Sequence, residues 1–548
     1  MSDGRVLHFF AGKGGVGKTT LATAYALTLA EKYPKEKILL VSSDASGSLT
    51  DLLKKKVSGK ATKLVAGKGT AGVFAAEYDA AATMAPFLEQ YEPALRAAAV
   101  KGAFLTEDEL QKILSTTLPG LEDLVFLFSL LEQIEDKSYD RVVVDTAPTS
   151  HTLRLVDQPA ALRKFLGIVR SGKAEKPAAK GKKAAAPAAD KSSFLDDVQA
   201  KAERVAALLK DATRTAFHLV ALPEPVPEAQ TRAYFARLND RGLPVVEFLI
   251  NQVEDKVGCA ACQGRRGLQA PHVRKLASLD KNVPIHLIGK RETAPRGLDA
   301  LKTFANEWAS GKETKALEFS AAEGPPALVR APSMPPIAAP PIPPTRLIFF
   351  VGQGGVGKSS CAAAAAVTLT EKEGPVLLIS TDPAHSLSDV LQSRLTDTET
   401  QVKGTKGLYA RELDVVGWFN SLRKRWKDKA DRGFESVKGA DAAYDRELLK
   451  NLLDSAPPAI DELAALSTLT DAIVQERFKR IVVDPAPATT MVRMVELPKI
   501  ALAWLESVHT AVSKYRARGL AELADDVAGM IKHIQRFEQS LATPAESR

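Results

Sequence analysis

The chain has 548 residues, a formal net charge of +8, 45% hydrophobic residues and only three cysteines. This composition is typical of a folded globular protein of about three or four domains, and so few cysteines exclude a disulfide scaffold. We find neither a transmembrane-length apolar run nor a secretory signal at the N-terminus, so we expect a cytoplasmic protein that does not insert into a membrane itself.

A phosphate-binding loop follows the first predicted strand. An apolar run at 6–10 precedes the sequence GKGGVGKTT, and an Ala-rich helical run comes next. Glycines at this spacing let backbone N–H groups surround phosphates while a helix N-terminus faces their charge. We expect Lys18 to reach the β and γ phosphates and the Thr19 hydroxyl to bind Mg²⁺. The predicted nucleotide-binding residues are Gly12, Gly14, Gly15, Gly17, Lys18, Thr19 and Thr20.

The rest of the first half, predicted to span 1–320, alternates apolar strands with helices. Strands are expected at 37–41, 142–144, 215–225, 245–252 and 283–289. This alternation predicts a P-loop NTPase domain of the α/β class, with a mostly parallel sheet flanked by helices.

A helical insertion is expected at about 81–137, and the apolar side chains at 121–130 are expected to form internal core. A Lys- and Ala-rich segment at about 171–191 is predicted to be disordered. This segment carries much of the net positive charge. Because no aromatic residues are interleaved with its lysines, we expect a solvated loop and no nucleic-acid binding.

A proline-rich linker is predicted at 321–345, before a second P-loop domain at 346–548. Proline keeps such a stretch extended, and its roughly 20 proline-rich residues could span on the order of 60 Å. The linker therefore permits the two halves to face each other.

The second half repeats the phosphate loop as GQGGVGKSS. Its predicted nucleotide-binding residues are Gly352, Gly354, Gly355, Gly357, Lys358, Ser359 and Ser360, with the Ser359 hydroxyl on Mg²⁺. Cys361, in the following turn, is expected to be a buried small side chain.

Two further motifs recur in the same order. SSDASGSLTD at 42–51 corresponds to STDPAHSLSD at 380–389, and RVVVDTAPTSHTLRL at 141–155 corresponds to RIVVDPAPATTMVRM at 480–494. The halves therefore form a tandem duplication, and strands are expected at 347–351, 376–379 and 481–483, with a helical insertion at about 416–478.

The second half is truncated relative to the first. After its last motif only one amphipathic helix follows, with an apolar face of Leu520, Leu523, Val527, Ile531, Ile534, Phe537 and Leu541. We expect a smaller sheet, one edge of which is either covered by this helix or exposed.

The motifs resemble those of the ArsA-type arsenite-pump ATPases and of the guided-entry ATPases that deliver tail-anchored membrane proteins. The loop KGGVGKT is also shared with MinD, ParA and nitrogenase iron protein relatives, whereas DPAHSLSD together with DTAPTSHTLRL is much narrower. The asparagine-glutamine pair at 251–252, a C-x-x-C pair and RETAPRGL complete the family's order. The similarity covers nearly all of 6–311 and then 347 to about 541, and the tandem form is similar to ArsA.

The resemblance implies an enzyme that hydrolyses ATP with Mg²⁺. Asp44 and Asp382 match the switch I aspartate that positions or activates the attacking water. Asp145 and Asp484 match the switch II aspartate near Mg²⁺, and Asn251 matches an adenine-contacting asparagine.

Lys13 matches the family's signature lysine, which reaches across a dimer to phosphates bound by the other unit. The second half has Gln353 at this position, and glutamine supplies no charge. An additional cation stabilises phosphoryl transfer as an arginine finger does. We therefore expect both sites to bind nucleotide and the site built on Lys358 to turn over faster.

Cys259 and Cys262 have the spacing of half a tetrahedral zinc site, which the family's single-unit dimers complete with a pair from each partner. The second half has no such pair. Three alternatives stay open: a vacant site, a redox-active pair, or a homodimer of two chains through their first halves.

The sequence thus predicts an ArsA-like ATPase whose halves pair as an intramolecular pseudodimer and act on a protein partner, such as a membrane protein or its precursor. One alternative is the ATP-driven subunit of an arsenite or anion efflux pump. The cysteines that bind arsenite in ArsA are absent here, and soft As(III) requires thiolates. The other alternative is a nucleotide-binding scaffold with little turnover.

Overall fold

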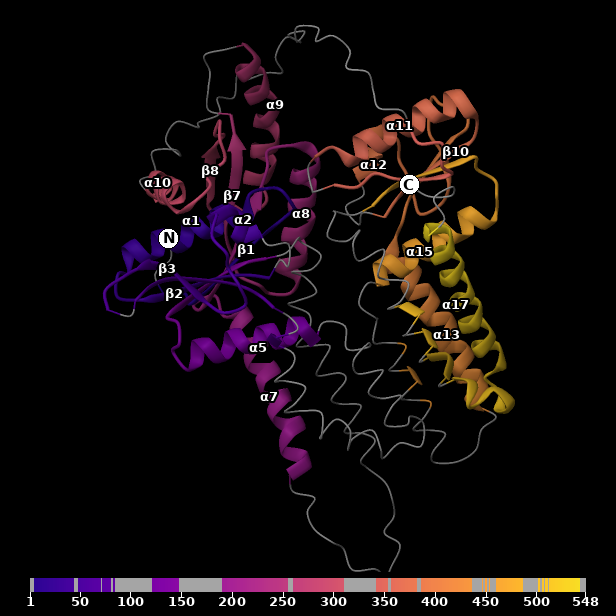
Figure 1. Ribbon diagram of the computed structural model, residues 1–548, viewed down its shortest axis with the longest axis horizontal. Coiled ribbons are helices and arrows are strands. Elements are labelled where there is room, and N and C mark those ends of the chain that lie inside the picture. Colours follow the sequence, from indigo (N-terminus) through magenta and orange to yellow (C-terminus); the bar gives the residue numbers. More distant parts are fainter. Residues whose placement is uncertain are drawn as a thin grey trace, which may run out of the picture. The chain divides into compact units, whose positions relative to one another are not determined.

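The computed structural model describes residues 4–43, 48–69, 71–79, 82–83, 121–146, 190–254, 260–309, 342–352, 356–381, 386–435, 446, 449–450, 453, 460–485, 501–502, 505–506, 508–510 and 512–542. These residues form two compact units, built mainly from the first and the second half of the chain. Each unit contains one sheet with helices packed against it (Figure 1).

The sheet of the first unit has eight strands among the described residues, in the order β3-β4-β2-β5-β1-β6-β7-β8. Neighbouring strands are parallel, except that β3 and β4 are antiparallel. The strands are β1 (Leu7–Gly12), β2 (Lys37–Ser42), β3 (Thr62–Ala66), β4 (Gly72–Glu77), β5 (Arg141–Asp145), β6 (Thr215–Ala221), β7 (Val245–Val253) and β8 (Ile285–Gly289). The strand that leads into the phosphate loop therefore lies inside the sheet, between β5 and β6.

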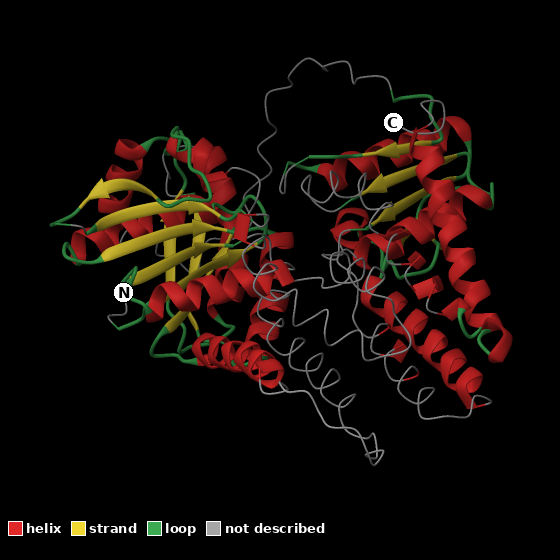
Figure 2. Cartoon of the chain, turned by 60° about the horizontal axis from the view of Figure 1, so that its bottom comes forward, coloured by secondary structure: helices red, strands yellow, loops and turns green. Residues whose placement is uncertain are grey.

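Helices cover both faces of this sheet (Figure 2). Their bounds are α1 (Lys18–Lys32), α2 (Ser48–Leu53), α5 (Leu121–Glu135), α7 (Asp190–Lys210), α8 (Pro225–Asp240), α9 (Ala260–Ala277) and α10 (Leu298–Ala309). Apolar side chains of α1 and α10 share a core with one face, and those of α9 pack on the other. The apolar side chains at 124–128 of α5 are buried, as expected of internal core.

The second unit has a smaller sheet, five described strands in the order β11-β12-β10-β13-β9. Its strands are β9 (Leu347–Phe349), β10 (Val376–Ser380), β11 (Thr400–Gln401), β12 (Leu408–Glu412) and β13 (Arg480–Asp484). Here the strand before the phosphate loop, β9, is an edge strand, because β13 is the only described strand that pairs with it. The prediction of a smaller sheet is confirmed for the described residues.

The helices of the second unit are α11 (Lys358–Glu373), α12 (Ser386–Leu391), α13 (Val415–Glu435), α15 (Ile460–Val474) and α17 (Ala521–Ala542), with a 3₁₀ turn η1 (Arg516–Arg518). The apolar face of α17 packs on α13 and α15 in a core that also includes Leu347, Leu377 and Ile481 of the sheet. The terminal helix therefore packs on helices that share a core with the sheet.

The predicted strands all occur, but the sequence analysis missed two hairpins. β3 with β4, and β11 with β12, add an antiparallel edge to each sheet. Most of the linker predicted at 321–345, and 171–189 of the predicted disordered segment, lie outside the described residues. The expectation that Cys361 is buried is wrong. Its side chain is exposed, because it begins a helix that follows an edge strand.

Candidate nucleotide sites

The first phosphate loop connects buried β1 to α1 and is shaped by glycines at close contacts. A Cβ atom on Gly12 would lie 2.2 Å from the Val220 carbonyl oxygen of β6. Gly17, the N-cap of α1, has φ 97° in the left-handed region, and Gly15 has φ 82°. Glycine adopts such angles without steric cost. The chain can therefore curl between strand and helix, which presents the N-terminal N–H groups of α1 to an anion.

Lys18 lies within the curl of this loop. Its Nζ donates to the Lys13 carbonyl oxygen at 3.0 Å, and the residue is only 8% exposed. A lysine held here places its charge beside the N-terminus of α1, where phosphates bind in loops of this type. The predicted residues Gly14 and Thr20 are also described, in the loop and in the first turn of α1.

A cluster of oxygen atoms lies beside the first turn of α1. Asp145, at the end of β5, is 1% exposed. Its Oδ2 accepts hydrogen bonds from Thr19 Oγ1 at 2.8 Å and from Ser42 Oγ at 3.1 Å. Ser42 is the last residue of β2 and is the register partner of Asp145. Hydroxyl and carboxylate oxygens are ligands that Mg²⁺ prefers, so Thr19 and Asp145 fit the predicted metal site.

Asn251 contacts the phosphate loop from β7. Its Nδ2 donates to the Val16 carbonyl oxygen at 2.9 Å, and a Cβ atom on Gly17 would lie 2.4 Å from the same nitrogen. Val16 is 1% exposed. The residue predicted to contact a base therefore also supports the backbone of the loop. Only the first unit has a described strand at the position of β7.

The second phosphate loop has fewer described residues. Gly352 follows β9, and Gly357, with φ 92°, is the N-cap of α11. Lys358, Ser359 and Ser360 form the first turn of α11. Gln353, Gly354, Gly355, and the predicted switch I residues Asp44 and Asp382, lie outside the described residues.

The second switch II aspartate occupies the equivalent strand end. Asp484 ends β13 and is 1% exposed. Its carbonyl oxygen accepts hydrogen bonds from the Thr381 backbone N–H at 3.1 Å and from Ser380 Oγ at 3.4 Å. Ser380 is its register partner on β10, as Ser42 is for Asp145. Both predicted metal-binding aspartates therefore lie at carboxyl ends of inner parallel strands.

Two glutamates that the sequence analysis missed hold the helices after the switch I motifs. Glu77 ends β4, and its Oε1 accepts the Thr50 N–H of α2 at 3.0 Å. Glu412 ends β12, and its carboxylate accepts the Ser388 N–H at 3.0 Å and the Ser388 hydroxyl at 2.6 Å. The pattern E-x-D, which recurs at 77–79 and 412–414, is the sequence signal that could have found them.

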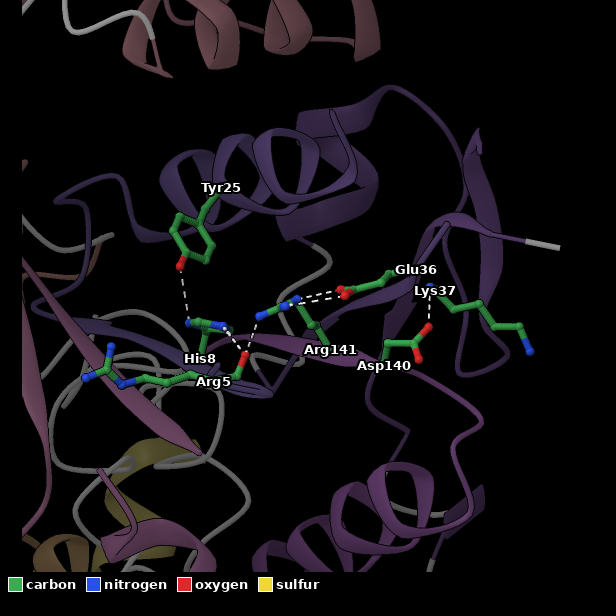
Figure 3. A network of polar contacts seen from close by, with 7 residues as sticks. All are labelled: Arg5, His8, Tyr25, Glu36, Lys37, Asp140 and Arg141. Carbon is green, nitrogen blue, oxygen red and sulfur yellow. Dashed lines mark hydrogen bonds and ion pairs between the residues drawn. The ribbon is translucent and has the colours of Figure 1, made fainter. Parts of the chain in front are cut away.

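An arginine at the start of the switch II strand anchors the first unit (Figure 3). Arg141 donates from Nε to Glu36 Oε2 at 2.6 Å and from Nη1 to the Arg5 carbonyl oxygen at 2.6 Å. Its side chain is 8% exposed. The guanidinium therefore ties β5 to the turn after α1 and to the residues before β1.

The second unit has the same anchor. Arg480 donates from Nε to Glu373 Oε2 at 2.6 Å and from Nη1 to the Thr345 carbonyl oxygen at 2.5 Å. Both arginines open the repeated motifs RVVVD and RIVVD, but no chemistry of the motif indicated their role.

A row of polar side chains crosses four neighbouring strands of the first unit. His8 Nδ1 lies 3.2 Å from His218 Nε2 and 3.3 Å from the Tyr25 hydroxyl of α1. Glu247 lies 2.5 Å from His218 Nδ1 and 3.1 Å from His286 Nε2. His8 is fully buried, whereas the His286 side chain is 41% exposed. The row runs from the surface at β8 to the underside of the phosphate-loop helix.

The hydrogen bonds of this row define how its protons are shared. His8 Nε2 lies 3.2 Å from the Arg5 carbonyl oxygen, which can only accept, so His8 Nδ1 is an acceptor (Figure 3). Burial, followed by the charge of His218, lowers the pKa of His8 well below its ordinary value. Burial alone would raise the pKa of Glu247, but hydrogen bonds from His218 and His286 hold that pKa below its usual range.

The cysteine pair is only partly described. Cys262 lies in the first turn of α9 and is half-buried, and Cys259 lies outside the described residues. Within the described ranges no group of three His, Cys, Asp or Glu side chains could hold a metal ion. The zinc site stays a prediction. In the same part of the chain, no helix is long and apolar enough to cross a bilayer.

Comparison with known proteins adds a family match across both units. A family model described as "Anion-transporting ATPase" matches residues 5–309 and 345–546. The chain is 28% identical to the ATPase ARSA1 of Chlamydomonas reinhardtii over 538 residues, 89% of this chain and 65% of that protein. It is 26% identical to a putative arsenical pump-driving ATPase of Halobacterium salinarum, covering 89% and 73%. It is 27% identical to the ATPase GET3 of Lodderomyces elongisporus, covering 54% of this chain and 88% of that protein.

Proposed function

The chain belongs to the anion-transporting ATPase family, and from this premise we propose that it is a Mg²⁺-dependent ATPase that acts on a protein partner. Its two halves would pair as an intramolecular pseudodimer and couple ATP binding and hydrolysis to a conformational change. The observation that carries the proposal is the cluster of Thr19, Ser42 and Asp145 beside the first turn of α1. Phosphates bound at that helix N-terminus would adjoin oxygen ligands suited to Mg²⁺.

Each phosphate loop would bind the phosphates of one nucleotide. Lys18 and Lys358 would neutralise the charge on the β and γ phosphates. Thr19 with Asp145, and Ser359 with Asp484, would hold Mg²⁺. The bound metal ion would withdraw charge from the phosphate oxygens.

The attacking water would be oriented by the switch I carboxylates, Asp44 in the first half and Asp382 in the second. Lys13 of the first half would place a cation beside the nucleotide of the second half. Gln353 of the second half would place no cation beside the nucleotide of the first half. This asymmetry supports faster turnover at the site of Lys358.

The nucleotide state would reach the partner through the switch helices. Glu77 and Glu412 fasten α2 and α12 at their first turns, directly after the switch I motifs. Ordering of those motifs around a γ phosphate would therefore act directly on α2 and α12, whose first turns are bonded to the ends of sheet strands. A membrane protein or its precursor is the partner class that the resemblance to guided-entry ATPases supports.

ATP hydrolysis by phosphate-loop variants tests this proposal. We expect Lys18→Ala and Lys358→Ala each to abolish turnover at its own site, and the double variant to lose activity by on the order of a hundredfold or more. We expect Lys358→Ala to remove the larger share of the activity. Full activity of the double variant would contradict the proposed enzyme, and a wild-type protein that binds ATP without turnover would favour the scaffold.

Lys13→Ala tests the pairing of the halves separately. If Lys13 serves the opposite half, this substitution should slow the site that remains active in the Lys18→Ala protein. An undiminished rate in the Lys13→Ala, Lys18→Ala protein would remove the argument for an intramolecular pseudodimer. The solution mass distinguishes the pseudodimer from a homodimer through the first halves.

A pump subunit is the second candidate, because one similar protein is called an arsenical pump-driving ATPase. This role predicts stimulation of ATP hydrolysis by arsenite. We expect no stimulation, since soft As(III) binds thiolates and the chain has three cysteines, two of them in one C-x-x-C pair. Pull-down from native cells with and without Mg·ATP would separate a nucleotide-dependent protein partner from a pump.

A further inference from the structure

The end of β7 leaves the regular ladder where it reaches the first phosphate loop. Pairing with β8 runs through Ile250, and the register shifts before it resumes at Val253. Between them the backbone of Gln252 has φ 57°, in the left-handed region that residues other than glycine rarely adopt. The Gln252 N–H donates to Asn251 Oδ1 at 2.9 Å. The bulge therefore fixes the orientation of the Asn251 amide.

That orientation directs the other end of the amide to the phosphate loop. With Oδ1 engaged by Gln252, Asn251 Nδ2 donates to the Val16 carbonyl oxygen at 2.9 Å. Val16 directly precedes Gly17, the N-cap of the helix whose N-terminus faces the predicted phosphates. A rotation of the Asn251 side chain would break this support of the loop.

One side chain of α9 replaces the ladder bonds that the bulge interrupts. Gln269 Nε2 donates to the Gln252 carbonyl oxygen at 3.1 Å, and its Oε1 accepts the Glu254 N–H at 2.8 Å. Gln269 is 7% exposed; its bond to Glu254 is buried and its bond to Gln252 is partly buried. Arg266 Nη1, one turn earlier, donates to the Glu254 carbonyl oxygen at 3.3 Å. The strained Gln252 backbone is therefore held in place by α9.

We propose that Gln269 is a positioning residue for phosphate binding in the first unit: it holds the bulge at Gln252, which aims Asn251 at the phosphate loop. This inference rests on the proposed function of that loop. It makes α9 a structural link to the first nucleotide site, so a ligand or partner that displaces α9 would change nucleotide affinity there.

A double-mutant cycle tests the proposal. In the full chain with Lys358→Ala, which restricts the measurement to the first site, the dissociation constant of Mg·ADP is measured by calorimetry. Gln269→Met keeps the side-chain length and removes both hydrogen bonds. We expect Gln269→Met and Asn251→Ala each to weaken binding about five- to tenfold, the effect of one buried hydrogen bond. The double variant should be no weaker than the Asn251→Ala variant, because Gln269 acts on the phosphate loop through Asn251.

Two further variants keep the test decisive. Gln263→Met makes the same change at an exposed position of α9 and should bind Mg·ADP like the background protein. Gln269→Glu keeps the acceptor for the Glu254 N–H, so it should bind with intermediate affinity even where Gln269→Met fails to fold. Effects of Gln269 and Asn251 that multiply in the double variant, or unchanged affinity in both Gln269 variants, would overturn the proposal.

The proposed function has a separate control in the same background. Lys18→Ala should abolish Mg·ADP binding. If binding persists, the first loop is not the nucleotide site, and both the proposed function and the role of Gln269 are wrong. If Lys18→Ala abolishes binding and the cycle shows no coupling, only the role of Gln269 is wrong.

Discussion

The two phosphate loops follow one sequence pattern in different surroundings. Three apolar positions of the first loop and its helix are buried: Ala11 is 0% exposed, Val16 1% and Leu21 1%. The corresponding residues of the second unit are exposed: Val351 by 54% and Val356 by 63%, with Cys361 also exposed. The apolar side chains of the same motif are therefore packed in one unit and exposed in the other.

The cause is the position of the strand that leads into each loop. β1 has β6 beside it, and β7 follows, so Val220 and Asn251 contact the first loop. β9 has no described strand on that side, and a Cβ atom on Gly357 would meet no atom within 4 Å. The motif specifies the curl of a phosphate loop, whereas the strands after the switch II motif supply its packing.

The features that both units share lie on the other side of the loop. Arg141 and Arg480 make the same pair of hydrogen bonds, and Glu77 and Glu412 hold the same helices. Among the described residues, the second unit therefore lacks the support on the β6 side and has the same support around the switch motifs.

A charge at the packed position tests this comparison most strongly. Val16→Asp should destabilise the first unit by about 3–5 kcal/mol, because it buries an unpaired carboxylate. Val356→Asp is the matched control in the second unit and should change stability by less than about 0.5 kcal/mol, since the side chain stays in water. Hydrogen exchange of peptides from β1 and β9 reports each unit in the full chain. Equal losses would mean that the second loop is also packed.

Alanine at the first glycine of each loop should have the next largest effect. A Cβ atom on Gly12 would lie 2.2 Å from the Val220 carbonyl oxygen, which belongs to a central strand and cannot move away. A Cβ atom on Gly352 would lie 3.0 Å from Val356 Cγ2, an exposed side chain that can rotate. We expect Gly12→Ala to cost about 2–4 kcal/mol and Gly352→Ala less than about 1 kcal/mol, measured by the same exchange. A larger loss from Gly352→Ala would contradict the open second loop.

The sequence predicted what depends on local pattern. Apolar runs identified the strands, and the phosphate-loop and aspartate motifs placed Thr19 beside Asp145 at neighbouring strand ends. Burial of Leu523, Val527 and Phe537 on α17 followed from helical periodicity. In each case a motif or a periodicity carries the information, even where the contact joins residues far apart in the chain.

What the sequence did not predict has no motif or periodicity that signals it. Cys361 is exposed because no described strand lies beside β9 on one side. The sequence pattern of its own helix carries no information about that neighbour. The role of Gln269 requires the left-handed backbone at Gln252, a feature of the bulge that no propensity of glutamine indicates. The two edge hairpins were missed because their outer strands, β3 and β11, are short and partly exposed.

The shared anchor should respond equally in the two units. Arg141→Met and Arg480→Met each remove hydrogen bonds from a largely buried guanidinium to a carboxylate and a carbonyl, and should each cost about 1–3 kcal/mol. Lys37→Met, at a half-buried side chain next to the same turn, is a control for loss of charge. Hydrogen exchange of β5 and β13 measures the losses. A difference of more than about 1 kcal/mol between the arginines would mean that truncation also altered the preserved side.

The smallest expected difference between the units is in how their stability depends on pH. The second unit has the buried Ile348 at the position that His8 occupies in the first. The pKa of His8 is lowered in the folded state from an ordinary value of 6.5, so the unfolded chain binds a proton that the folded chain excludes. The stability of the first unit therefore rises with pH between the lowered pKa of His8 and 6.5, and this contribution is lost as the pH falls through that range. The lowered pKa of Glu247 adds a loss of the same sign below its ordinary value of 4.5.

His8→Ile, which copies the second unit, separates these two effects. Tyr25 and His218 contact His8 directly, and Arg5 and Arg141 also lie close enough to influence its charge. We expect exchange from β1 of the native protein to lose up to about 1.4 kcal/mol of stability per pH unit just below pH 6.5, the limit for one proton. His8→Ile should flatten this slope and keep the loss below pH 4.5, whereas β9 should show no slope from this source in either protein. An unchanged slope in His8→Ile would assign the acid sensitivity to another group of the row.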